Sequence, residues 1–485
     1  MATREAAPTS GTGAVSAWSP PSDPAKQRRN AIIIVILAFL GWMMVWTDGN
    51  LVLIMYPDVM PHVYSSFPSY LWVPMFSGML FISFLAAWIG SLIIGPLMDR
   101  YGRRALFQIT ILGTAIFSGF QYFITSFWNW TGLRSVDQLL NNSEWSVGGT
   151  MVTETVSTRM RGIALAIMQS GFVAGYATAA LIVYYVLPAF PANVGFRVAF
   201  LVSVFPAIVI AIARYWVRDP PRYEAIRALK RAQKANDPAT IVAIEKVYPT
   251  DQLRATKFTY VQILSRDQVR KSVSLAFWSF MLAGIGIALL TFMPLYIEFF
   301  KGITYTGITG LYAIALYATI PAYLVNGFIA DYIGAKYSAL LFAAIEVIGI
   351  MVFISPSIHG YYPTFFSFLL FSWGLNGAFA STIRMNTESF PTRARGTGSG
   401  WVNAWYSFGF AIWPVIFGGF AIPMFAGTNF FVNYSGALNF VTLSASQWGT
   451  VFTWYAAFPM VITIIVCWLG IPYVRGRAAL EEIST

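Results

Sequence analysis

Long apolar runs constrain the fold of this chain more than any other feature. A helix needs about 20 apolar residues to cross the hydrocarbon core of a membrane, and twelve runs of that kind occur in two groups of six. The runs cover 31–55, 70–97, 105–127, 130–152, 162–187 and 198–216, then 272–297, 306–329, 337–356, 363–384, 397–421 and 448–473. This pattern predicts an all-α membrane protein with twelve transmembrane helices.

The charged residues agree with a membrane protein and argue against nucleic-acid binding. Only 11% of the residues are charged, whereas soluble domains carry roughly 25%. Of the 31 Lys and Arg, all but Arg134, Arg197 and Lys301 fall in the tails or in the loops of one side. Because basic loops stay in the cytoplasm, the distribution of Lys and Arg predicts the orientation of the chain in the membrane. The net charge of +11 is interpreted as contact with membrane lipid. We expect a plasma-membrane protein with both termini in the cytoplasm.

The hydrophilic segments divide the chain into five parts. Residues 1–30 are expected to form a disordered cytoplasmic tail, and 474–485 form a second tail. Two six-helix halves, 31–216 and 272–473, flank a cytoplasmic linker at 217–271. We interpret the linker as a solvated connection and leave a regulatory or partner-binding role open. The single cysteine, Cys467, excludes a disulfide framework.

Two short motifs recur at nearly the same offset, which indicates an internal repeat. Thr153–Gly162 (TETVSTRMRG) and Thr387–Gly396 (TESFPTRARG) share six of ten residues at an offset of 234. Gly95–Arg104 (GPLMDRYGRR) and Gly327–Lys336 (GFIADYIGAK) match at an offset of 232. The repeat predicts two six-helix bundles related by a pseudo-twofold axis along the membrane normal, with a substrate site at their interface.

The segment GPLMDRYGRR resembles the loop between helices 2 and 3 of the major facilitator superfamily. Gly95 permits close helix packing, Gly102 takes the turn, and Asp99 is expected to cap the third span. In the fourth span, Arg134, Glu144 and Glu154 stand ten residues apart within a segment ending EWSVGGTMVTETVSTRMRG. This is similar to the metabolite:proton symporter branch and its sugar-acid and sialate relatives.

This resemblance implies a secondary transporter that works by alternating access, with no enzyme activity, cofactor, metal or catalytic residue. The implied partners are protons and a small-molecule substrate, namely an organic anion such as a sugar acid, a carboxylate or an aromatic acid. We expect a monomer. Departures from the family pattern at Gln138, Asn142 and Ser143, and in Asp48-Gly49-Asn50, leave the substrate open.

Polar residues of the fourth span fall on one helical stripe. Arg134, Asp137, Asn141, Glu144 and Gly148 are spaced by three or four positions. Because a charge at the bilayer centre costs about 2.5–3.5 kcal/mol, these groups must face water or one another. We interpret the stripe as a substrate and proton path, with a buried packing network as the alternative.

Asp48 and Glu144 are predicted to carry the proton. Asp48 stands in an apolar run, and Glu144 is ten residues from Arg134, about 15 Å along a helix. Neither acid has an obvious permanent partner in the sequence, and an unpaired carboxyl in apolar surroundings tends to keep its proton. Arg134 is expected to bind an anionic substrate. The other predicted substrate-binding residues are Asp137, Asn141, Gln169, Asn376, Asn403 and Tyr406.

The resemblance also implies a cytoplasmic gate. In proteins similar to this one, acids and bases of the repeated motifs form salt bridges that close the cytoplasmic side. On this chain the gate residues would be Gly95, Asp99, Arg103, Glu154, Arg161, Asp331, Glu388, Arg393 and Arg395.

Three other functions are weighed against symport. A sugar or polyol porter or uniporter typically has paired glutamines on helix 7 and a Pro-Glu-Thr-Lys-Gly run after helix 12. Here 272–297 holds no Gln, and the chain ends YVRGRAALEEIST. A non-transporting receptor on a transporter scaffold usually carries long cytoplasmic domains. A membrane enzyme is disfavoured because the two histidines, His62 and His359, form no cluster with a nucleophile or metal ligands.

Overall fold

The computed structural model describes residues 23–68, 72–157, 160–247, 259–266, 268–303, 311–312, 314–390, 394–417 and 444–474. The first half holds α1 (Pro24–Val63), α2 (Trp72–Tyr101), α3 (Arg103–Phe120), α4 (Phe127–Asn141), α5 (Glu144–Thr155), α6 (Arg161–Val186) and α7 (Ala192–Arg214). The linker carries α8 (Pro221–Ala235), α9 (Pro238–Val247) and α11 (Thr259–Ile263). The second half holds α12 (Val269–Phe300), α14 (Ile320–Ile333), α15 (Ala335–Ile354), α16 (Tyr361–Ser389), α17 (Arg395–Val415), α19 (Ala445–Phe452) and α20 (Phe458–Gly470).

Ten of the spans among the described residues are long and apolar enough to cross a membrane. The other two predicted spans correspond to the pair α4–α5 and to α17, which bury many polar side chains. The all-helical, twelve-span architecture predicted from the apolar runs is therefore confirmed. The first helix begins earlier than expected, at Pro24 within the proposed tail, where the Asp23 carboxylate accepts from the Ala25 and Lys26 amides.

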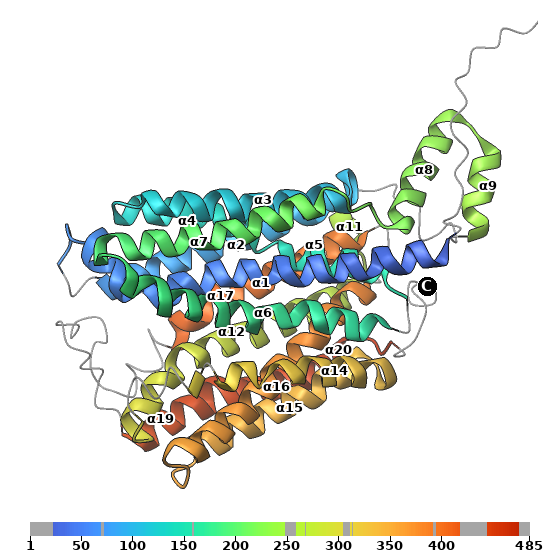
Figure 1. The fold of residues 1–485 in the computed structure, drawn as a ribbon. Coiled ribbons are helices and arrows are strands. Elements are labelled where there is room, and N and C mark those ends of the chain that lie inside the picture. Colours follow the sequence, from blue (N-terminus) through green and yellow to red (C-terminus); the bar gives the residue numbers. More distant parts are fainter. Residues whose placement is uncertain are drawn as a thin grey trace, which may run out of the picture.

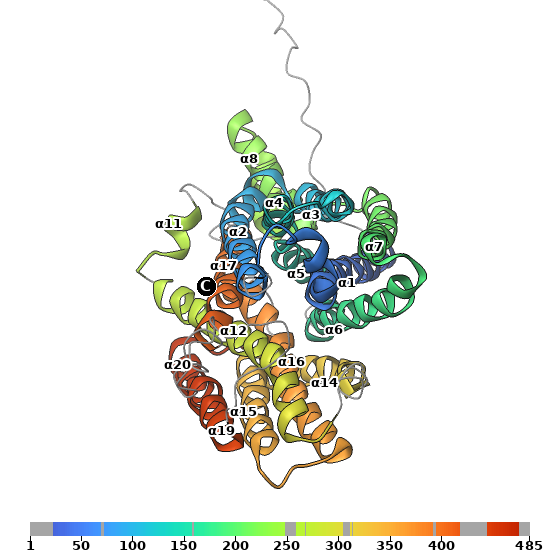
Figure 2. The same ribbon diagram turned by 90° about the vertical axis from the view of Figure 1, so that its left-hand side faces the viewer.

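The two halves lie side by side, and the linker helices α8 and α9 stand at one end of the bundle, called here the linker end (Figure 1). Figure 2 shows α2 of the first half beside α17, and α6 beside α14. Glycines allow both close approaches. A Cβ atom on Gly95 would lie 2.9 Å from the Gly396 carbonyl oxygen, and one on Gly162 would lie 2.6 Å from that of Gly327. Because these positions are repeat counterparts, the interface follows the pseudo-twofold symmetry.

The fourth span is broken where the sequence predicted one continuous helix. Helix α4 ends at Asn141 and α5 begins at Glu144. The break is stabilised from the other half, because the Asn142 carbonyl accepts a hydrogen bond of 2.9 Å from the Asn403 side chain. The side-chain amide of Asn142 also donates to the Ser407 hydroxyl at 2.5 Å. A side chain of α17 thus satisfies a backbone carbonyl at the break.

Candidate functional site

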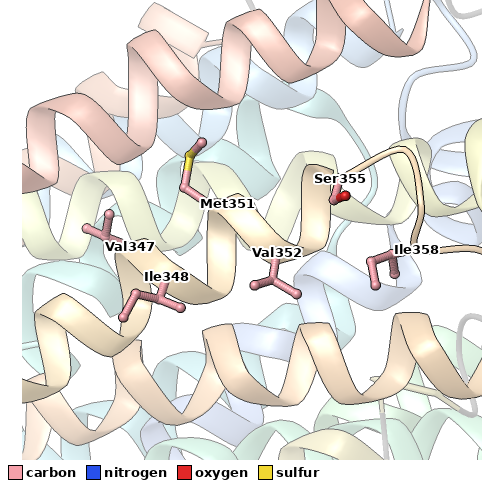
Figure 3. A pocket seen from close by; sticks show the side chains of 6 residues that line it. All are labelled: Val347, Ile348, Met351, Val352, Ser355 and Ile358. Atoms are coloured by element: carbon pink, nitrogen blue, oxygen red, sulfur yellow. The ribbon is translucent and has the colours of Figure 1, made fainter.

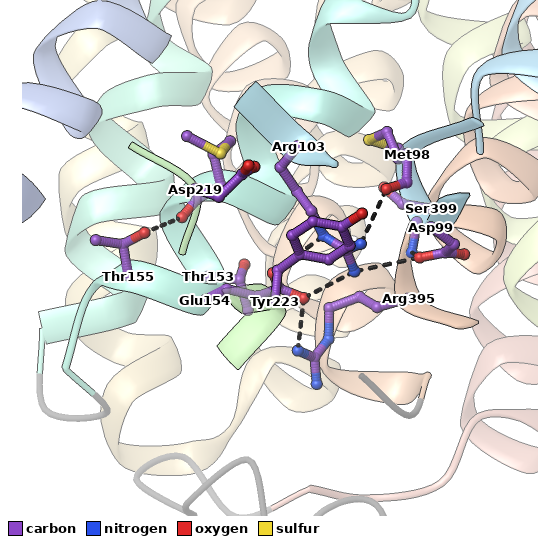
Figure 4. Close-up of polar contacts among 12 residues, drawn as sticks. Met98, Asp99, Arg103, Thr153, Glu154, Thr155, Asp219, Tyr223, Arg395 and Ser399 are labelled. Carbon is purple, nitrogen blue, oxygen red and sulfur yellow. Dashed lines mark hydrogen bonds and ion pairs between the residues drawn. The ribbon is translucent and has the colours of Figure 1, made fainter. Parts of the chain in front are cut away.

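Arg103 lies at the centre of a buried charge cluster at the linker end. Its guanidinium is 3.2 Å from Asp99 and 3.2 Å from Glu154. Glu154 is in turn 3.2 Å from Arg395 of α17. Figure 4 shows this arrangement, with Tyr223 of the linker over Arg103 at 4.6 Å. Burial raises the pKa of Tyr223. The cluster therefore joins the two halves through Glu154, and the linker contacts it through Tyr223.

The second half builds a related cluster from different residues. Arg384 of α16 lies 2.6 Å from Asp331 and 3.0 Å from Glu388. Glu388 also pairs at 2.7 Å with Arg161 of the first half. The repeat counterpart of Arg103 is Ala335, so Arg384 provides the guanidinium from the interior of α16, whereas Arg103 is the first residue of α3. All four side chains are buried.

The expectation that Asp99 caps the third span is wrong. Helix α3 follows Gly102, whose φ is 106°, and has no side-chain cap. The Asp99 carboxylate instead crosses the interface and accepts from the Thr397 amide and hydroxyl, both at 2.8 Å. It caps the start of α17, where free amides and the helix dipole favour an anion. Asp331 does the same for α6 by accepting from the Gly162 amide at 3.1 Å.

One contact lies between two copies of the same repeat position. The Thr153 hydroxyl donates to the Thr387 hydroxyl at 2.9 Å, and the two residues are separated by the repeat offset of 234. A residue that touches its own counterpart must lie at the pseudo-twofold axis. The remaining predicted gate residue, Arg393, lies outside the described residues.

The predicted absence of a partner for Asp48 is also wrong. Arg134 contacts the carboxylates of both Asp48 and Asp137, with one nitrogen between them. The other Asp48 oxygen accepts from Ser118 at 2.6 Å and from Gln121 at 3.3 Å. Helix spacing predicted the Arg134–Asp137 contact, but Asp48 reaches it from α1. One guanidinium is thus shared by two buried carboxylates.

Glu144 also has a partner that the sequence did not predict. Its carboxylate pairs with Arg214, the last residue of α7, and both side chains are fully buried. Glu144 accepts from Thr110 at 2.5 Å, and Arg214 also donates to the carbonyls of Phe107 at 2.6 Å and Leu37 at 2.8 Å. The pair connects α1, α3, α5 and α7.

A small, partly open cavity adjoins the Arg134 cluster. It measures about 20 Å³, space for roughly one water molecule. The polar atoms of its wall come from Ser83, Arg134, Gln138 and Asn142, and the apolar part from Val45, Trp46, Gly49, Leu53, Leu80 and Phe84. Within the described residues, the Nε atom of Arg134 has no hydrogen-bond partner. The cavity therefore combines a buried cation with aromatic walls.

The other predicted substrate residues lie in separate polar contacts. Gln169 accepts from the Trp145 indole at 2.6 Å, and Tyr406 stacks on that ring at 5.6 Å. Asn141 donates to Asp137 at 3.0 Å, and Asn403 to Ser91 at 3.0 Å. Asn376 accepts from the Tyr323 hydroxyl at 2.6 Å. The structure thus unites Arg134, Asp137 and Asn141 and leaves Gln169, Asn376, Asn403 and Tyr406 outside the cavity wall.

Two further features do not form part of this site. An apolar recess on α15 is lined by Val347, Ile348, Met351, Val352, Ser355 and Ile358 (Figure 3), and its lining holds a single side-chain hydroxyl. Glu346, on the same helix, is fully buried, and neither of its carboxylate oxygens has a hydrogen-bond partner in the described part of the chain. Over the same residues, no group of three His, Cys, Asp or Glu could hold a metal ion.

Sequence reasoning missed two functional candidates, Arg214 and Arg384. Each stands at the end of a predicted apolar run, at 198–216 and 363–384, where a basic residue is usually read as a solvent-facing flank. The acids that they bind, Glu144, Asp331 and Glu388, were all identified. The predicted site residues contain more Asp and Glu than Arg. This excess indicated that some buried acids have basic partners elsewhere in the chain.

Comparison with known proteins gives the family. The family model of the major facilitator superfamily matches residues 31–414. A Bacillus subtilis (strain 168) protein named for niacin/nicotinamide transport, NiaP, is 33% identical over 172 residues, covering 36% of this chain and 42% of that protein. The match thus spans less than half of that relative. The cis,cis-muconate transport protein of Acinetobacter baylyi is 26% identical over 73% of this chain and 79% of its own length.

Solved structures support the same fold. The proton:xylose symporter XylE, bound to 6-bromo-6-deoxy-D-glucose, superposes with a TM-score of 0.73 over 94% of this chain and 99% of that one, at 15% identity. This likeness concerns the fold alone. The family resemblance predicted from the repeated motifs is confirmed. The chain belongs to the major facilitator superfamily.

Proposed function

We propose that this protein is a proton-coupled symporter of a small organic anion in the plasma membrane, working by alternating access. The observation that carries the proposal is the buried Arg134, held between Asp48 and Asp137 at the wall of a small cavity. A buried guanidinium is suited to a carboxylate because its donors match the two oxygens.

Charge balance in this cluster supplies the coupling. One guanidinium faces two carboxylates, and a substrate carboxylate would add a third negative charge. In a medium of low dielectric constant such an excess is costly, so binding of the anion favours protonation of Asp48 or Asp137. Thermodynamic linkage then requires that a proton also favours the anion. Of the two predicted proton carriers, Asp48 is the one that shares its arginine with a second carboxylate. Glu144 remains a prediction, and its closed pair with Arg214 favours a structural role.

The walls of the cavity favour a flat, unsaturated substrate. Trp46 and Phe84 line the cavity, and Phe410 of the second half lies 5.6 Å and 5.3 Å from their rings. Aromatic faces pack well on conjugated or ring carboxylates. The relatives named for niacin and cis,cis-muconate transport support this class. We also propose that the substrate contacts four more side chains once the small cavity opens, namely Gln169, Asn376, Asn403 and Tyr406.

The ion pairs at the linker end support an alternating-access cycle. Glu154–Arg395 and Arg161–Glu388 both join the halves, so the described arrangement is closed at that end. We place this end in the cytoplasm because α8, α9 and the start of α1 lie there (Figure 1) and the linker is basic. A monomer suffices, since both halves are in one chain.

Uptake by the purified protein in liposomes tests the proposal. Radiolabelled nicotinate, cis,cis-muconate, a sugar acid and xylose would be offered with and without an inward proton gradient. We expect a planar carboxylate to accumulate only with the gradient. Arg134→Ala should abolish its binding, and Arg134→Lys, which keeps the charge, should retain part of it. Uptake that is indifferent to pH would instead support a uniporter, and binding without transport would support a receptor.

A further inference from the structure

Helix α8 carries an exposed basic stripe that the proposed transport cycle does not use. Arg227, Lys230 and Lys234 follow Tyr223 at spacings of four, three and four residues, and Arg231 lies beside them. All four basic side chains are exposed. Glu224 is the one acid in the helix. The stripe therefore has a net positive charge over its whole length.

Two contacts show which way this stripe faces. The Tyr223 hydroxyl donates to the Arg100 carbonyl at 3.2 Å, so this side of α8 faces the ends of the spanning helices. On the opposite side, Ala225 and Leu229 belong to the apolar cluster that includes Ile244 of α9. In Figure 1, α9 lies farther from the spanning helices than α8 does. The basic stripe consequently faces back toward the plane of the membrane.

The helix also lies at the right depth and position to meet lipid. It begins five residues after Trp216, which is 71% exposed at the end of α7 beside Tyr215, 66% exposed. Exposed Trp and Tyr at the end of a spanning helix mark the headgroup region. Both views show α8 extending past the outline of the spanning helices (Figure 1, Figure 2). That part of the helix therefore overlies lipid, not protein.

We propose that the stripe formed by Arg227, Lys230, Arg231 and Lys234 binds the headgroups of anionic phospholipids. Each basic residue near an anionic leaflet strengthens the attraction by about fivefold, and the effect fades within a Debye length of about 10 Å. The four charges of the stripe act together because they share the face directed at the membrane. Insertion of the apolar face is excluded, since α9 covers it.

Headgroup binding has a consequence for the charge cluster of Arg103. Tyr223 is on the same face of α8 as the stripe, and its ring covers the Arg103 guanidinium at 4.6 Å. A lipid that holds α8 against the membrane also holds Tyr223 on this cluster. Anionic lipid therefore favours the state that is closed at the linker end.

A fluorophore on α8 tests the proposal with the full-length protein. Cys467, the single native cysteine, would be replaced by Ala, and a dye attached at Gln233→Cys, an exposed position of α8. The protein would be placed in nanodiscs of phosphatidylcholine, with or without phosphatidylglycerol, that contain a headgroup-labelled quencher. We expect stronger quenching with phosphatidylglycerol, reversed by high salt. Neutralising the stripe (R227Q, K230Q, R231Q and K234Q together) should remove the increase.

Two controls distinguish the effect of the stripe on quenching from the effect of the protein's net charge. The pair R227K and R231K preserves the charge and should preserve the increase. A matched variant, K26Q, R28Q, R29Q and K246Q, loses the same number of exposed charges elsewhere and should also preserve it. Equal quenching in both lipid mixtures overturns the proposal. An increase in quenching that persists in the variant with the neutral stripe also overturns the proposal. The stripe would then be a candidate binding site for an acidic protein partner.

Discussion

Glu154 and Arg395 stand 241 positions apart in the chain and meet at 3.2 Å with both side chains buried. Replacing Glu154 by Gln leaves Arg103 and Arg395 without their common anion. Removing one partner of a buried pair costs about 3–5 kcal/mol, enough to shift a two-state equilibrium more than a hundredfold. We therefore expect Glu154→Gln to open the linker end.

Labelling of a buried position would measure this opening. A cysteine in place of Ser399, which is fully buried near the cluster, should react faster with a thiol reagent applied from the linker side. The Cys467→Ala background removes competing reaction. Glu245→Gln on α9 removes an acid far from the interface and should change nothing. Unchanged labelling in Glu154→Gln would contradict the proposed gate.

The two predicted proton carriers should respond differently to neutralisation. Asp48→Asn mimics the protonated acid, so exchange of substrate across a liposome membrane should continue while accumulation driven by a pH gradient is lost. Glu144→Gln should keep accumulation and melt at a lower temperature, because its role is to pair with Arg214. If Glu144→Gln lost accumulation at an unchanged melting temperature, Glu144 would be a proton-coupling residue and not a structural one.

The buried pair of Glu144 and Arg214 should behave as a structural link. Arg214→Ala leaves a fully buried carboxylate unpaired and should lower the free energy of unfolding by about 3–5 kcal/mol. The double variant Glu144→Leu with Arg214→Met removes both charges and should recover most of that loss. Thermal melting in detergent would compare the three proteins. A double variant no more stable than Arg214→Ala would show that the charges are needed for more than stability.

Lys301 should make stability depend on pH at the end of the molecule opposite the linker. It lies beyond the spanning part of α12, and burial lowers the pKa of its amine to about 8. The unfolded chain keeps this proton up to about pH 10.4, so unfolding takes up a proton between these values and stability rises with pH. Below pH 8 the cost of the buried charge is fully present.

Melting temperatures measured between pH 7 and pH 10 would check this. The wild type should gain stability relative to Lys301→Met as the pH rises through about 8. Lys301→Arg, which stays charged across the range, should lack the gain. A constant difference between wild type and Lys301→Met would refute a titrating Lys301.

The sequence predicted the fold and one part of the site for reasons that can be traced to particular residues. Apolar runs define spans because lipid requires them, and the repeat placed Glu154 and Glu388 as counterparts. Spacing within one helix placed Arg134 beside Asp137. In each case the relationship is local, or is copied by the repeat, so it can be read along the chain.

Partners contributed by distant helices were not predictable in this way. Arg214 reaches Glu144, and Asp48 reaches Arg134, only because α1, α5 and α7 pack together in space. The Asp99 cap failed as a prediction for the same reason, since its target lies 298 residues away. The break between α4 and α5 depends on Asn403, which no pattern within the fourth span could reveal.

The hydrogen bond between Thr153 and Thr387 has a consequence for assembly from separate pieces. Each threonine meets the residue that occupies its own place in the other half. Two copies of one six-helix unit, facing each other across a true twofold axis, would make the same contact with Thr153 against itself. At this position the closed face is self-complementary, and the contact itself does not require that the two halves share one polypeptide.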